Sequence, residues 1–188
     1  MTRGWLFALG LTCLAPLAVM AQVNPKPGDG TADSEVLCPV VAGEIRFCGA
    51  SPEFVLTPQQ DNSEVTAYYT TPEDIQVAVI FEGTGSNQGL TVPALQDAAL
   101  SILSGASGTP VANIPVLERT SVGVDGVPRP NFVYRGNVGG VDYVYSNTMV
   151  LLENTVAQLV TIDNGTMVIS PAHRDLHMRF TALVQVNR

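Results

Sequence analysis

Residues 141–162 read VDYVYSNTMVLLENTVAQLVTI, and this stretch decides the fold class. The segments Val141–Leu152 and Val156–Ile162 are rich in β-branched and aromatic residues, and Glu153-Asn154 between them fits a tight turn. One face of the first segment carries Val141, Tyr143, Tyr145, Met149 and Leu151. The opposite face is also partly apolar, so the predicted sheet needs cover on both sides.

The strand pattern extends upstream of this pair. Val116–Val124 and Phe132–Arg135 also fit strands, with a turn-rich segment at 125–130 and a glycine-rich connection at 136–140. Short connections between consecutive strands are typical of antiparallel pairing. Together these segments predict an antiparallel meander.

A hairpin is predicted nearer the N-terminus. Glu64–Thr70 is rich in β-formers, Ile75–Glu82 alternates apolar and polar residues, and the turn residues 71–74 separate them. The buried face of the second segment is expected to carry Ile75, Val77, Val79 and Phe81.

One helix is expected at Thr91–Ser104, with Thr91 as its N-cap, Pro93 in the first turn and Gly105 after its end. Its apolar stripe is predicted to be Leu95, Ala98, Ala99, Ile102 and Leu103.

A second helix is expected to begin with Ser170 as N-cap and Pro171 in the first turn. Its buried stripe is predicted to be Ala172, Leu176, Phe180, Leu183 and Val184. The predicted fold is therefore α+β, with an antiparallel sheet of about six strands flanked by two helices. The chain order is two strands, a helix, three strands and a helix.

Residues 1–21 have the pattern of a secretory signal, with a positive start, a short apolar run and small residues before a cleavage point after Ala21. Lipidation of Cys13 and an uncleaved anchor are the alternatives. Residues 22–35 read as a flexible leader, and residues 36–188 as a single α+β domain. We expect an exported protein without a membrane span after cleavage, periplasmic if the source is bacterial and otherwise secreted.

Cleavage would leave two cysteines, Cys38 and Cys48, ten positions apart. In an oxidising compartment such a pair predicts one disulfide, which closes the lead-in at 38–48. A redox or metal role would favour a C-x-x-C spacing, which the sequence lacks.

The formal net charge is −8 and Lys26 is the sole lysine. A nucleic-acid-binding surface needs clustered basic residues, so we expect no nucleic-acid partner.

The two histidines, His173 and His177, are spaced i and i+4 on the second predicted helix. This spacing begins many helical zinc sites, but Arg174 breaks the H-E-x-x-H form and no further ligands share the spacing. We expect a solvent-exposed or rim-located pair with no metal and no other cofactor.

The segment 82–90 follows a strand and precedes a helix, with glycines at 83, 85 and 89. This spacing is one residue longer than the dinucleotide fingerprint and lacks the lysine of a P-loop, so it predicts a flexible connection. No nucleophile elbow and no catalytic residue is found. Tyr134, Tyr143 and Tyr145, together with Gly83 and Gly85, form the predicted binding surface.

The element order, the expected docking of Phe180 on the sheet, and the run 141–145 leading to 159–162 resemble the PsbP-like fold family. The resemblance covers residues 51–188 and implies an α/β/α sandwich. That family includes extrinsic photosystem subunits and small exported bacterial proteins, and it offers no catalytic residues to transfer. This chain departs from it by its disulfide-closed lead-in and by having no tryptophan after residue 21.

We therefore expect an exported, non-catalytic accessory or binding module that contacts a protein or small ligand through its sheet face or the 82–90 loop. One alternative is a metal-dependent protein or enzyme centred on His173 and His177. The other is a structural cell-envelope component held by its leader.

Overall fold

The computed structural model describes residue 38 and residues 40–48, 53–57, 65–83, 89–153 and 155–187. The chain divides into two units, Met1–Leu37 and Cys38–Arg188, and every described residue belongs to the second. The expected signal peptide and leader lie outside the described residues, so these boundaries stay predictions.

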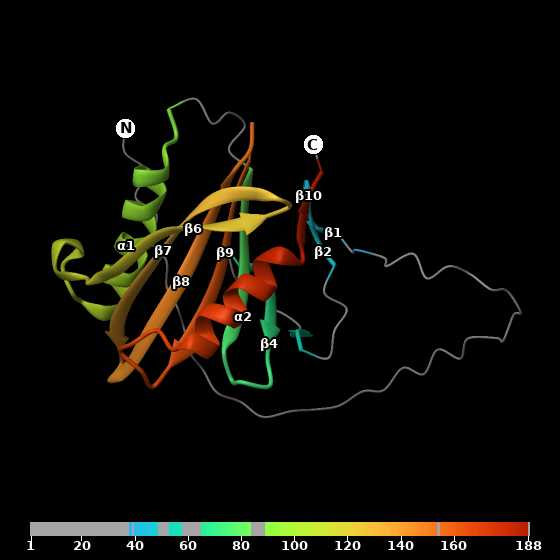
Figure 1. Ribbon diagram of the computed structural model, residues 1–188. Coiled ribbons are helices and arrows are strands. Elements are labelled where there is room, and N and C mark those ends of the chain that lie inside the picture. The colour runs from blue at the N-terminus through green and yellow to red at the C-terminus, as the bar shows by residue number, and fades with distance from the viewer. Residues whose placement is uncertain are drawn as a thin grey trace, which may run out of the picture. The chain divides into compact units, whose positions relative to one another are not determined.

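A seven-stranded antiparallel sheet forms the centre of the second unit (Figure 1). Its strands lie in the order β3-β4-β5-β9-β8-β7-β6. Their bounds are β3 Val55–Thr57, β4 Val65–Thr70, β5 Gln76–Gly83, β6 Val116–Val124, β7 Val127–Val138, β8 Val141–Leu151 and β9 Thr155–Asn164.

A three-stranded antiparallel sheet and two helices complete the unit. The small sheet has the order β1-β2-β10, with bounds β1 Val40–Ala42, β2 Ile45–Phe47 and β10 Val184–Val186. The helices are α1 Val92–Ser107 and α2 Pro171–Ala182, and a 3₁₀ turn covers Val111–Asn113. The predicted α+β class with two flanking helices is confirmed, and the structure adds strands to the predicted number.

The connections within the meander are two tight turns, so its strands are longer than predicted. Asp125-Gly126 and Gly139-Gly140 each have positive φ at both positions, as a type I′ hairpin turn requires. The predicted turn at 125–130 is therefore too long, because Pro128 and Pro130 lie within β7. β8 pairs with β7 only from Asn131 onward, so the two prolines remove no hydrogen bond from that ladder.

Helix α1 covers one face of the large sheet. Thr91 caps it by accepting a hydrogen bond from the Ala94 backbone N–H at 3.3 Å, and Gly108 ends it with a φ of 70°. The helix runs past Gly105, where we expected its end. Its buried stripe is Leu95, Ala99, Leu100 and Leu103, whereas the predicted members Ala98 and Ile102 are exposed.

Leu103 of helix α1 packs directly over Gly136 in β7. A Cβ atom on this residue would lie 2.8 Å from Cδ2 of Leu103 and 2.9 Å from Cδ1. We expect Gly136→Val to lower the free energy of unfolding by about 1–3 kcal/mol, because the added methyl groups overpack this contact. Urea titration would measure the loss. Gly123→Val is the matched control, because a Cβ there meets no atom within 4 Å. Equal effects of the two substitutions would contradict the packing argument.

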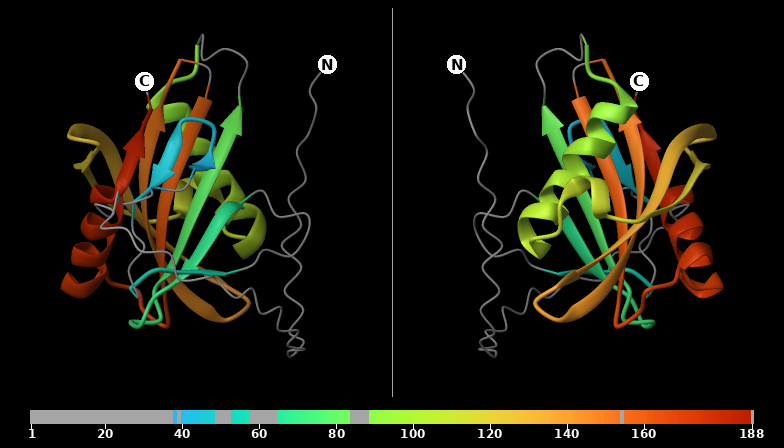
Figure 2. Two further views of the ribbon diagram at one scale, coloured as in Figure 1. Left: turned by 90° about the vertical axis from the view of Figure 1, so that its right-hand side faces the viewer. Right: turned by 90° about the vertical axis from the view of Figure 1, so that its left-hand side faces the viewer.

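Helix α2 and the small sheet cover the opposite face of the large sheet (Figure 2). The main core lies there, and its aromatic centre is formed by Phe47, Phe54, Tyr69 and Phe180. The expected docking of Phe180 on the sheet is confirmed. The two helices therefore enclose the large sheet from both sides, as its two partly apolar faces require.

The predicted C-terminal helix is too long. Helix α2 ends at Ala182, and Val184 begins β10, which pairs with β2 through Val184↔Phe47 and Val186↔Ile45. Val184 is buried as predicted, but it lies in a strand and not in the helix. This strand pairs with the edge of β2, whose backbone groups would otherwise lack partners.

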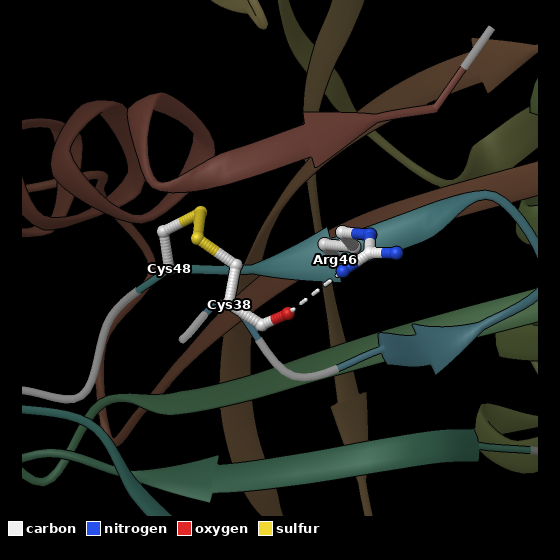
Figure 3. Close-up of a disulfide and its surroundings, with 3 residues drawn as sticks. All are labelled: Cys38, Arg46 and Cys48. Atoms are coloured by element: carbon white, nitrogen blue, oxygen red, sulfur yellow. Dashed lines mark hydrogen bonds between the residues drawn. A yellow bond between two sulfur atoms is a disulfide. The ribbon is translucent and has the colours of Figure 1, made fainter. Parts of the chain in front are cut away.

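The predicted disulfide between Cys38 and Cys48 is present and closes the β1–β2 segment (Figure 3). Arg46 donates from Nη1 to the Cys38 carbonyl at 3.5 Å. The Cys48 backbone N–H donates to the Leu183 carbonyl at 2.8 Å. The disulfide-closed segment is therefore joined to the chain between α2 and β10.

Candidate functional site

Buried polar side chains gather between α2 and the large sheet. We define the polar cluster as His173 and His177 of α2, Asn131 of β7, Thr148 of β8 and Thr161 of β9. His173 is 0% exposed and His177 is 2% exposed, so the expectation of a solvent-exposed or rim-located pair is wrong. The two rings share the buried stripe of α2 with Leu176, Phe180 and Thr181.

The histidine rings bond to threonine hydroxyls of the sheet. Thr161 Oγ1 lies 2.8 Å from His173 Nε2 and 2.9 Å from His177 Nδ1. Thr148 Oγ1 lies 2.7 Å from His177 Nε2 and donates to Asn131 Oδ1 at 3.0 Å. The rings therefore bridge two separate strands.

These contacts fix the direction of every hydrogen bond, because a hydroxyl has only one proton to donate. Thr148 gives its proton to Asn131, so it accepts from the Nε2–H of His177. Nδ1 of neutral His177 is then an acceptor, and Thr161 donates to it. Thr161 accepts in turn from the Nε2–H of His173. One directed chain of hydrogen bonds thus runs from His173 to Asn131.

Burial keeps both histidines neutral. Desolvation and, to a smaller extent, the neighbouring His173 together lower the pKa of His177 to about 3. Desolvation also lowers the pKa of His173, against smaller raising effects from Asp163 and from a backbone hydrogen bond with Thr161. Near neutral pH the directed chain is therefore the stable arrangement.

The histidine pair has little capacity left for a metal ion. Three of its four ring nitrogens bond to hydroxyls, and the fourth, His173 Nδ1, is buried without a hydrogen-bond partner in the described part of the chain. Across those same residues, no three His, Cys, Asp or Glu side chains gather as metal ligands would. A metal would have to displace hydrogen bonds that already satisfy the rings.

A second candidate site lies on the face of the large sheet that α1 partly covers (Figure 2). We define the tyrosine face as Tyr68 of β4 with Tyr143 and Tyr145 of β8, all of them half-buried. Tyr145 stacks on Tyr134 of β7, with ring centroids 4.9 Å apart and planes 8° apart. Tyr134 itself is only 5% exposed, among the residues that α1 covers.

The three phenols of the tyrosine face influence one another. Desolvation raises the pKa of Tyr145 to about 12, and Tyr143 adds to this rise. Tyr143 also helps burial to raise the pKa of Tyr68, although these two residues belong to strands β8 and β4. The phenols of Tyr68 and Tyr145 therefore remain protonated at neutral pH, and tyrosine hydroxyl groups donate and accept hydrogen bonds.

A small polar hollow adjoins the tyrosine face. Thr70, Asp74, Gln76 and Asn164 are among the residues that line it. Asn164 lies directly opposite Tyr143 in the β8–β9 ladder, and directly opposed residues project from the same face. The sheet therefore brings amide and hydroxyl groups beside the aromatic rings.

The structure separates the residues of the predicted binding surface. It brings Tyr143 and Tyr145 together at the surface and places Tyr134 beneath α1. Gly83 ends β5, and Gly85 lies outside the described residues. The predicted binding surface left out Tyr68, although this residue lies in the segment 64–70 that was predicted to be a strand. Sequence reasoning also missed Thr148 and Thr161 as partners of the histidines.

Neither helix of the described residues has the length and apolar character needed to cross a bilayer. No protein-family model matches the sequence, and no curated protein does so either.

Solved structures do match the fold. The solution structure of cyanobacterial PsbP (CyanoP) from Synechocystis sp. PCC 6803 superposes with a TM-score of 0.51 and 13% sequence identity. The match covers 77% of this chain and 87% of that one. LpqN, involved in cell envelope biogenesis of Mycobacterium tuberculosis, superposes with a TM-score of 0.43 and 14% identity over 77% of this chain and 83% of its own. The chain therefore has a PsbP-like fold, which confirms the predicted resemblance.

Proposed function

We propose that this PsbP-like protein is an exported, non-catalytic accessory or binding module that contacts a protein or small ligand through the tyrosine face. The observation that carries the proposal is the gathering of three half-buried phenols on a sheet face that α1 covers only in part. The 82–90 loop stays in the proposal as a second contact.

The chemistry of the tyrosine face suits binding. Tyrosine offers a large apolar ring and a hydroxyl at little cost in conformational entropy, which makes it frequent in interfaces. The rings of Tyr143 and Tyr145 stand on a paired strand, and Tyr145 is held by its stack on Tyr134. A partner would thus meet a surface that needs little reordering.

The state of the histidines argues against a reaction centred on them. Their rings are buried and neutral, and three of their four nitrogen atoms are bonded to threonines within the protein. A general acid or base must reach a substrate atom, and the polar cluster gives no such access.

Native mass spectrometry of the protein purified from its own cells tests the proposal. We expect a retained partner or ligand on the wild type, and at least tenfold less retention by Tyr143→Ala, because the substitution removes an interface ring. Val168→Ala is the matched control, since Val168 is an exposed apolar residue in the connection to α2. Equal retention by the two variants would exclude the tyrosine face. A stoichiometric metal ion would instead support the alternative at the histidines.

A further inference from the structure

We propose that the polar cluster is an acid-sensitive latch, which holds α2 on the large sheet while both histidines are neutral and releases it when they take up protons. The latch lies on the face opposite to α1 and does not depend on the proposed function of the tyrosine face.

The directed chain of hydrogen bonds has no place for another proton. A proton added to His177 would sit on Nδ1, facing the hydroxyl of Thr161, which already donates to that atom. A proton added to His173 would sit on its buried Nδ1, which lacks a hydrogen-bond partner. Either change leaves a buried polar hydrogen unsatisfied and introduces a charge away from water.

The charged groups around the histidines do not remove this cost. On β9, Asp163 and a backbone hydrogen bond with Thr161 favour the charged form of His173, while Arg174 on α2 opposes it. Arg174 is itself paired with Glu118 of β6. The α2-facing part of β8 presents the hydroxyls of Ser146 and Thr148 beside aliphatic residues, and β10 contains only Val and Gln. Desolvation is therefore the largest influence on both rings.

The response to acid is confined to one layer of the fold. Both histidines of the protein lie in α2, so no comparable group lies in α1 or in the strands. The ion pairs Arg174–Glu118 and Arg179–Glu53 also hold α2, but they lie at the surface, where such pairs contribute little. The backbone ladders of the large sheet run between strands and include no residue of α2.

The pKa values of His177 in the closed and the open form determine how much acid raises the opening constant of α2. In the released helix the pKa of His177 returns to its ordinary 6.5, whereas in the closed form it is about 3. Since the open form binds protons more readily, lowering the pH from 7.5 to 5.0 raises the opening constant about 30-fold through His177 alone. His173 adds to this change in the same direction.

Hydrogen–deuterium exchange of the full chain at pH 7.5 and pH 5.0 tests the latch, with rates corrected for the intrinsic effect of pH. We expect exchange across 171–182 to rise about 30-fold or more, while exchange across 92–107 in α1 stays the same. Equal changes in both helices, or none in either, would overturn the proposal.

A variant pair separates the latch from general acid sensitivity. In His173→Gln/His177→Gln the helix carries no group that titrates between these pH values on the sheet-facing side, so the difference between α2 and α1 should vanish. If α2 of this variant still opens selectively at pH 5.0, the histidines are not the cause. Should the variant fail to fold, the comparison of the two helices in the wild type decides alone.

Discussion

Phe180→Ala should lower the free energy of unfolding by about 3–5 kcal/mol, because it removes a fully buried ring and leaves a cavity. Phe180 is 0% exposed and contacts the rings of Phe47 and Phe54, with centroids 5.5 Å and 5.8 Å away. It therefore joins α2, the small sheet and the segment before β3 in one cluster. Urea denaturation followed by circular dichroism would measure the loss.

Met178→Ala is the matched control for this prediction. Met178 lies in the same helix but is 51% exposed, so its truncation should change stability by less than about 0.5 kcal/mol. A loss from Phe180→Ala no larger than that of the control would mean that α2 does not pack on the sheet as described.

Replacing both cysteines, Cys38→Ala and Cys48→Ala, should cost about 3 kcal/mol of unfolding free energy. The disulfide closes a short loop, and its removal restores conformational freedom to the unfolded chain. Thermal and urea unfolding of the variant and the wild type would give the difference.

Reduction of the wild type provides the control for the cysteine substitutions. The reduced protein should lose nearly as much stability as the variant, whereas a reductant should leave the variant unchanged. If the variant and the oxidised wild type unfold at the same urea concentration, the disulfide does not stabilise this fold.

The long periodic elements could be predicted from the sequence because local rules determine them. The cap at Thr91, the cap at Ser170 and the alternation in β5 and β8 were sufficient to locate both helices and the main strands. The ends were less well predicted. Gly105 was expected to stop α1, but the helix continues to Ser107 and ends at Gly108, which has the left-handed conformation of a C-cap.

The short strands could not be predicted, because three residues show no periodicity. β2 pairs with β1 and with β10, and β10 is a strand only through its pairing with β2, which joins residues near 46 and 185. The register of such a pair depends on tertiary structure. The same limit explains why Val184 was assigned to a helix.

The buried histidines were misjudged for a related reason. The buried stripe of α2 was predicted from apolar residues alone, so it did not include His173 and His177. Their partners Thr148 and Thr161 belong to strands and not to α2. Polar residues can line a core when each finds a partner, and only the fold brings these partners together. For the tyrosines, the strand pattern predicted alternation, but the position of α1 decides which rings stay at the surface.

The pairing of β2 with β10 affects how the protein folds during synthesis. The ribosome must release almost the entire second unit before Val184 and Val186 can reach Phe47 and Ile45. Until then the β2 edge and the aromatic cluster around Phe47 lack their final cover. Contacts of such large sequence separation slow folding, so a nascent chain would remain unfinished until its last strand emerges.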